Sequence, residues 1–257
     1  LKKLKKGDNF IEKGKFEKAR NCYQLALGER SSDTRIINKI AYTYFLEKDY
    51  GTAIFWYERS IIINYIDTDA RRNMAKCHVL LDDLESAIQH ISYAHLFNRN
   101  NAEITKELKD IYNQAKINYN LNSFFPKYQI IKDDNTKVII ISEHSVWAAY
   151  AAVEALWKYE PGYEEKMVTI STQATAVIRK KEALLNALIT YENASTTNKK
   201  ELFPLLELLR EISLQGQIDN FLLYEIIAKE QPNYILQLPK ERIEELKNYL
   251  VAYRSKI

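Results

Sequence analysis

The feature that most constrains this chain is a repeat with a period of 34 residues. The stretches GKFEKARNCYQLAL, KDYGTAIFWYERSI and DDLESAIQHISYAH begin at residues 14, 48 and 82 and align without gaps. The matching positions are Phe16, Tyr50 and Leu84; Ala19, Ala53 and Ala87; Tyr23, Tyr57 and Ile91; Ala26, Ser60 and Ala94; and, upstream, Gly7, Ala41 and Ala75 with Phe10, Tyr44 and His78. A fixed period of this length indicates stacked repeats, each a small supersecondary unit.

The recurring residues indicate that each unit is a pair of antiparallel helices. Small residues allow two helices to approach closely, and aromatic residues fill the space between one pair and the next. The 6 glycines and 5 prolines in 257 residues also favour packed helices over turn-rich β structure. Because one pair cannot bury its apolar face alone, neighbouring pairs are expected to stack.

This pattern resembles the tetratricopeptide repeat, a helix–turn–helix unit whose arrays form a superhelix with a concave groove. The resemblance covers residues 1–118 and implies three repeats with a capping helix at 102–118. The expected repeats are 1–33, 34–67 and 68–101. One departure is that the proline that usually closes each unit is replaced by Ser31, Tyr65 and Arg99.

The resemblance also implies which residues line the groove, because the first helix of each unit usually does so in this family. Carried onto this sequence, the candidate peptide-binding residues are Arg35, Asn38, Tyr42, Phe45, Arg72 and Lys76. They combine an aromatic patch with a basic one, which suits a peptide or helix that has a carboxylate and an apolar anchor. Two plainer interpretations stay open: the charges form a solvated helix face, and the aromatic residues pack against a neighbouring helix.

Chaperone-binding members of the family hold a terminal carboxylate with lysine, asparagine and arginine residues. Arg72 and Lys76 keep the positive charge at the corresponding positions of the third repeat. Leu4, Asp8 and Tyr42 do not match the remaining partners. A receptor for chaperone tails is therefore not predicted.

The second half of the chain has a different pattern. Residues 119–127 break the helical periodicity and are expected to form a linker. Two β-rich runs around a polar turn predict a β-hairpin at 128–142. Helices are then expected at 143–160, 174–192, 199–215, 218–230 and from Pro239 to about 254, which makes 128–257 a mainly helical C-terminal domain. The whole chain is thus expected to be all-α apart from this hairpin.

No residues form a convincing catalytic, cofactor or metal site in the sequence. His90 and His95 are five residues apart on a predicted helix, which places them well off one face. Ser142, Glu143 and His144 are adjacent in the sequence, and adjacent side chains cannot form a nucleophile–base pair in the usual geometry. We therefore interpret Ser142 or Glu143 as the start of a helix, in a capping role. The scarcity of glycine leaves no phosphate-binding loop. The chain is therefore predicted not to be an enzyme.

Composition limits the remaining function classes. The net charge of +3 is too small to indicate nucleic-acid binding, and the apolar runs are shorter than a membrane span. Cys22 and Cys77 lie inside expected helices and are interpreted as buried free thiols. Because the chain begins with Leu1 rather than methionine, we expect it to be a fragment or a processed form. A cytoplasmic location is slightly favoured, and a periplasmic or envelope location stays open.

The sequence therefore predicts a non-catalytic scaffold or adaptor that binds a protein or peptide partner in the concave groove. Two alternatives stay open. In the first, residues 120–257 carry an enzymatic or regulatory activity and the repeats serve for targeting. In the second, the chain is a structural subunit of a larger assembly, such as one at the cell envelope.

Overall fold

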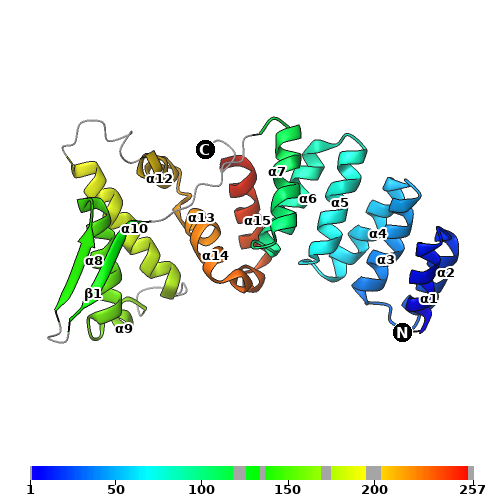
Figure 1. The fold of residues 1–257 in the computed structure, drawn as a ribbon, viewed down its shortest axis with the longest axis horizontal. Coiled ribbons are helices and arrows are strands. Elements are labelled where there is room, and N and C mark those ends of the chain that lie inside the picture. The colour runs from blue at the N-terminus through cyan, green and yellow to red at the C-terminus, as the bar shows by residue number, and fades with distance from the viewer. Residues whose placement is uncertain (1, 118–125, 134–136, 169–174, 195–203, 254–257) are drawn as a thin grey trace. The chain divides into compact units, whose positions relative to one another are not determined.

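A computed structural model describes residues 2–117, 126–133, 137–168, 175–194 and 204–253 of the chain. The chain forms two compact units (Figure 1). Unit 1 comprises Leu1–Asn120 together with Pro232–Ile257, and unit 2 comprises Leu121–Gln231. No helix in the described ranges is long and apolar enough to cross a membrane.

Unit 1 contains the repeat array. Its helices are α1 (Lys2–Glu12), α2 (Phe16–Leu27), α3 (Thr34–Leu46), α4 (Tyr50–Ile63), α5 (Thr68–Leu80), α6 (Leu84–Phe97) and α7 (Ala102–Gln114). Each helix packs against the next along the chain, as Figure 1 shows from the blue to the green ribbons. The all-α array of helical pairs expected from the 34-residue period is confirmed, and α7 is the helix expected after the third pair.

Local signals explain where these helices begin and turn. The side chains of Asp33, Asp49, Asp67, Asp83 and Asn101 cap α3 to α7 by accepting hydrogen bonds from backbone N–H groups of the first turn. The backbone takes the left-handed conformation at Gly14, Lys48, Asp82 and Lys116, again 34 residues apart. The geometry of the turn thus recurs once beyond the three repeats, directly after α7.

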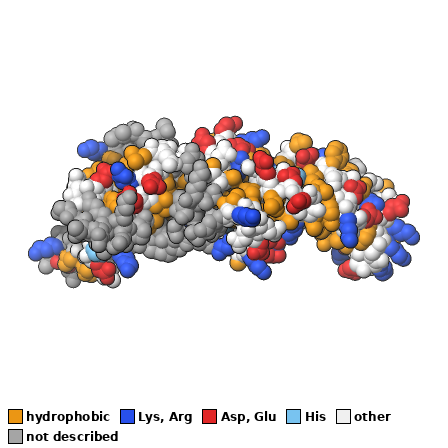
Figure 2. All heavy atoms as spheres, turned by 90° about the horizontal axis from the view of Figure 1, so that it is seen from above, with side chains coloured by type: hydrophobic (Ala, Val, Ile, Leu, Met, Phe, Trp, Pro, Cys, Tyr) orange, Lys and Arg blue, Asp and Glu red, His pale blue; other side chains and the backbone are white. Residues whose placement is uncertain are grey.

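The small and aromatic repeat positions form the core of the array. Ala19, Ala53 and Ala87 have no exposed surface, and Tyr23 and Tyr57 are almost fully buried. A Cβ atom added at Gly7 would lie 2.3 Å from Cε1 of Tyr23, so the position accepts only glycine without a shift of the ring. On the face of unit 1 seen in Figure 2, hydrophobic side chains gather in bands between acidic and basic ones.

The last part of the chain packs on the array. It consists of a 3₁₀-helix (Pro232–Gln237), α15 (Lys240–Asn248) and a π-helix (Tyr249–Tyr253), and all three contact α6. Ile243 is buried with Tyr93 and Phe97 of α6. The Glu244 carboxylate accepts hydrogen bonds from the hydroxyls of Tyr65, at 2.7 Å, and Tyr93. The expected domain boundaries stay a prediction. The sequence analysis assigned Pro232–Ile257 to the C-terminal domain, whereas in the structure this segment groups with unit 1.

Unit 2 begins with the expected β-hairpin. Strands β1 (Tyr128–Lys132) and β2 (Val138–Ser142) pair antiparallel, with Tyr128 opposite Ser142 and Ile130 opposite Ile140. Both strands contact α8 (Ser145–Tyr159), which packs against α10 (Thr175–Asn193). The other elements are α9 (Tyr163–Val168), α12 (Pro204–Leu214), α13 (Ile218–Phe221), a π-helix (Leu222–Ile227) and α14 (Ala228–Glu230).

Two sequence expectations for unit 2 differ from the structure. The helix expected at 218–230 is interrupted by the π-helical turn, whose residues are all buried. The side-chain cap expected at the start of α8 is wrong: the N-cap residue is His144, without a capping side-chain bond, and the Ser142 hydroxyl instead donates to the carbonyl oxygens of Lys127 and His144. Most of the expected linker, and residues 199–203 of an expected helix, fall outside the described ranges.

Candidate functional site

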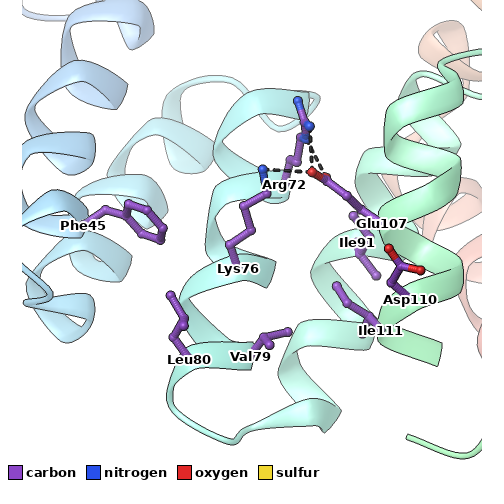
Figure 3. A pocket seen from close by; sticks show the side chains of 9 residues that line it. All are labelled: Phe45, Arg72, Lys76, Val79, Leu80, Ile91, Glu107, Asp110 and Ile111. Atoms are coloured by element: carbon purple, nitrogen blue, oxygen red, sulfur yellow. Dashed lines mark hydrogen bonds and ion pairs between the residues drawn. The ribbon is translucent and has the colours of Figure 1, made fainter. Parts of the chain in front are cut away.

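A cavity of about 310 Å³ opens on unit 1 between α3, α5, α6 and α7 (Figure 3). We call it the groove pocket. It is lined by Phe45, Arg72, Lys76, Val79, Leu80, Ile91, Glu107, Asp110 and Ile111. Three of the six residues predicted from the sequence, Phe45, Arg72 and Lys76, therefore come together here, and four further apolar side chains share the cavity with them.

The helical period explains this convergence. Arg72, Lys76 and Val79 follow one another at intervals of four and three residues, which places them on one face of α5. Phe45 comes from the last turn of α3, on the side of α5 away from α7. Glu107, Asp110 and Ile111 lie on the facing side of α7 (Figure 3). The pocket is thus built mainly by α3, α5 and α7, with Ile91 contributed by α6.

Glu107 is a residue of the pocket that the sequence analysis did not predict. Its carboxylate accepts hydrogen bonds from Nε and Nη2 of Arg72, at 2.5 and 2.7 Å, and forms an ion pair with Nζ of Lys76 at 2.9 Å. The Arg72 guanidinium also pairs with Glu103. Both cations that were predicted to bind a partner's anion are therefore matched inside the molecule.

These contacts shift the pKa values of the participants. Hydrogen bonding to Glu107 is the main cause that raises the pKa of Arg72. Burial on its own would raise the pKa of Glu107, but the hydrogen bonds from Arg72 and Lys76 outweigh it, so that its pKa is lowered. Both shifts favour the charged forms. The network is therefore ionised at neutral pH.

The other predicted residues have different surroundings. The rings of Tyr42 and Phe45 stack with centroids 5.9 Å apart, and Tyr42 is 42% exposed. The Asn38 amide donates to both carboxylate oxygens of Asp67, at 3.0 and 3.2 Å. Arg35 pairs with Asp33 and keeps 81% of its side chain exposed. None of these three residues, Arg35, Asn38 and Tyr42, lines the groove pocket.

The histidines do not form a metal centre in the part of the chain that is described. The rings of His78 and His90 stack 5.3 Å apart, and Nδ1 of His78 lies 3.1 Å from Oδ2 of Asp83. Burial, with smaller contributions from Arg71 and His78, lowers the pKa of His90 to about 3, so it is neutral. Within the described residues, no group of three or more His, Cys, Asp or Glu side chains is placed to hold a metal ion.

Two observations bear on the alternatives left open by the sequence. Cavities of about 590 and 430 Å³ occur in unit 2, and His144 lines neither of them. On unit 1, α4 exposes Phe55 by 56%, Ile62 by 83% and Ile63 by 45%. An apolar helix face of this kind is what the assembly alternative anticipates, although nothing in the described residues covers it.

Comparisons with known proteins give one sequence match and several similar structures. Residues 3–33 match the family model of the tetratricopeptide repeat. A search of curated proteins found no match. Among solved structures, the first TPR of Spaghetti (RPAP3) bound to an HSP90 peptide is 23% identical over 44% of this chain and 90% of that one, with a TM-score of 0.42.

Two further structures resemble the chain at lower identity. The type III secretion translocator chaperone SycD of Yersinia enterocolitica is 18% identical over 45% of this chain and 93% of that one, with a TM-score of 0.42. MamA is 16% identical over 90% of this chain and 97% of that one, with a TM-score of 0.39.

Proposed function

We propose that this chain, whose first unit is built from tetratricopeptide-type repeats, is a non-catalytic interaction scaffold that binds a partner's peptide or helix in the groove of α3, α5 and α7. The observation that carries the proposal is the groove pocket, an apolar cavity flanked by these helices. Its volume of about 310 Å³ lies at the lower end of the usual range for binding pockets, about 300–1,000 Å³. It is therefore suited to one or two apolar side chains of a bound segment.

The lining of the pocket supports an apolar anchor as the main source of affinity. Val79 and Leu80 contribute accessible aliphatic surface, Leu80 being 52% exposed, and the buried side chains of Ile91 and Ile111 complete the wall of the cavity. Removing such surface from water stabilises a complex by about 25 cal/mol per Å². A few buried anchors usually supply most of the binding energy in interfaces of this kind.

The predicted site residues have distinct parts in this proposal. Phe45 is an apolar wall of the pocket, and the aliphatic stems of Arg72 and Lys76 cover its side. Tyr42, stacked on Phe45, extends the apolar surface beyond the cavity. Arg35 is exposed enough to meet a longer partner segment, whereas the amide of Asn38 is engaged by Asp67.

The chain offers a closely matched pair of variants for testing this site. Leu80 and Leu81 are neighbours with exposures of 52% and 51%, but only Leu80 lines the groove pocket. Peptides selected from a random displayed library against the intact chain would be titrated into Leu80→Glu and Leu81→Glu by fluorescence anisotropy. A carboxylate inside the apolar cavity should weaken binding about tenfold or more, and the control should change Kd less than twofold.

The outcome that contradicts the proposal is equally clear. If Leu80→Glu and Leu81→Glu bind the selected peptides with the same affinity, the groove pocket is not where they bind. If no peptide is selected at all, the scaffold role of this groove is rejected. Circular dichroism of both variants would establish that each retains its helices.

A further inference from the structure

One carboxylate on the α7 side of the groove pocket has no cationic partner among the described residues. Glu103, Glu107 and Asp110 follow one another at helical spacing on α7. Glu107 is held by Arg72 and Lys76, and Glu103 shares the same arginine. Asp110 lines the pocket, is exposed, and makes no hydrogen bond or ion pair with any described residue. Of these three carboxylates, Asp110 alone has no cation bound to it among the described residues; Lys106, four residues before it on α7, forms no ion pair with it.

This arrangement disfavours a carboxylate on the partner. To reach Arg72 or Lys76, it would have to displace Glu107, whose side chain is only 22% exposed and which is held by a two-pronged hydrogen bond. Because Glu107 is attached to α7, it competes at a high effective concentration. A partner carboxylate would also approach the unpaired charge of Asp110, and like charges at an interface oppose binding.

The same arrangement favours a cation. We propose that the partner segment places a bulky apolar side chain in the groove pocket and a lysine or arginine against Asp110. This inference rests on the proposed function and specifies the chemistry of the partner. Asp110 adjoins Ile111, an apolar wall of the pocket, so the partner's cation and anchor are close together.

The pair with Asp110 would set specificity more than affinity. Its carboxylate is exposed, and exposed ion pairs contribute modestly and weaken as salt screens them. Charge complementarity at the rim of an interface mainly speeds association and excludes partners of the wrong sign. The apolar anchor then holds the segment, and the stem of the partner's lysine or arginine covers apolar surface beside it.

The test uses the peptides selected by display on the intact chain. We expect the enriched sequences to share one large apolar residue with a basic residue nearby. Binding of such a peptide should weaken about two- to fivefold in Asp110→Asn and further in Asp110→Lys. A version of the peptide with glutamate at the basic position should bind the native chain poorly and the Asp110→Lys chain better.

A control variant separates this pair from the overall charge of the chain. Glu58 is exposed on α4, and Glu58→Lys changes the net charge by the same amount as Asp110→Lys. It should leave Kd within about twofold of the native value at moderate salt, where distant charges are screened. Asp110 lies near the C-terminal end of α7, where a positive charge suits the helix dipole, so Asp110→Lys is expected to fold.

Failure of this inference is distinguishable from failure of the proposed function. If Leu80→Glu weakens binding and Asp110→Lys does not, the groove is used but the cation is not recognised. The same conclusion holds if the selected peptides are acidic and lose affinity when their terminal carboxylate is amidated. If neither variant changes binding, the proposed function fails, and this inference fails with it.

Discussion

Glu244 is the polar link between α15 and the repeat array, and its removal gives a quantitative test of that contact. In Glu244→Ala, the hydroxyls of Tyr65 and Tyr93 both lose their acceptor. A hydrogen bond to a charged group contributes about 1.5–3 kcal/mol. Because the Glu244 side chain is 38% exposed, water replaces part of this, and we discount the two bonds together to about 1–2 kcal/mol.

The assay should report local rather than global opening. Hydrogen–deuterium exchange of residues 240–248 follows the free energy at which α15 detaches from α6. A loss of about 1–2 kcal/mol corresponds to exchange that is about five- to thirtyfold faster, since 1.4 kcal/mol is a factor of ten. Exchange in α2, which makes no contact with α15, should be unchanged.

A neighbouring glutamate provides the control. Glu245 pairs with Arg242 on the same helix and is exposed, so Glu245→Ala removes a charge from α15 without removing a contact to the array. Its expected effect is that of a helix-surface pair, about 0.2–0.5 kcal/mol. If Glu244→Ala and Glu245→Ala accelerate exchange equally, the two tyrosine hydrogen bonds do not hold the segment, and the reasoning is refuted.

Two further predictions concern the array itself. Gly7→Ala should destabilise unit 1 by about 1–3 kcal/mol, because the new Cβ would lie 2.3 Å from the Tyr23 ring. Gly51→Ala, where the new Cβ meets no neighbouring atom within 4 Å, should instead stabilise it by about 0.4–1 kcal/mol. The two variants should shift the thermal midpoint in opposite directions, and shifts of the same sign would contradict the close packing at Gly7. The lowered pKa of Glu107 means that its ion pairs contribute stability above its ordinary value of 4.5 and lose it as pH falls through the folded-state pKa. Urea midpoints at pH 7 and pH 3 should therefore differ more for the native chain than for Glu107→Gln, and equal differences would exclude this role of the Arg72 network.

The repeat array follows from the sequence because its signals are local and recur. Ala19, Ala53 and Ala87 recur every 34 residues and are fully buried, since each fills the same narrow contact between two helices. The β-hairpin at the start of unit 2 was also predictable, because its two apolar runs flank a short polar turn. Boundaries depended on capping residues, and the cap expected at Ser142 was wrong because its hydroxyl bonds carbonyl oxygens instead.

Contacts between distant parts of the chain left no such signal. Tyr65 stands where the family usually has a proline, and the sequence alone showed it only as a departure. In the structure its hydroxyl binds Glu244, 179 residues away. Nothing in the local pattern of either residue indicates the other: Tyr65 lies in the turn between α4 and α5, and Glu244 is one of several charged residues on α15.

The candidate site was predictable only in part for the same reason. The resemblance located Phe45, Arg72 and Lys76, which come together at the groove pocket. It did not reveal that Glu107 forms ion pairs with both cations. Glu107 and Lys106 are both charged residues of one amphipathic helix, and only packing against α5 distinguishes the engaged side chain from the exposed one.

The order of segments in unit 1 has a consequence for how the protein is made. Tyr93 and its acceptor Glu244 are 151 residues apart, with all of unit 2 between them. A ribosome adding about 5–20 residues per second needs roughly 8–30 s to make that stretch. During this time, the aromatic side chains of α6 lack the cover that α15 supplies. The nascent array must stay soluble while this face of α6 is exposed. An mRNA that ends before the codon for Pro232 would yield a protein in which the face stays exposed permanently.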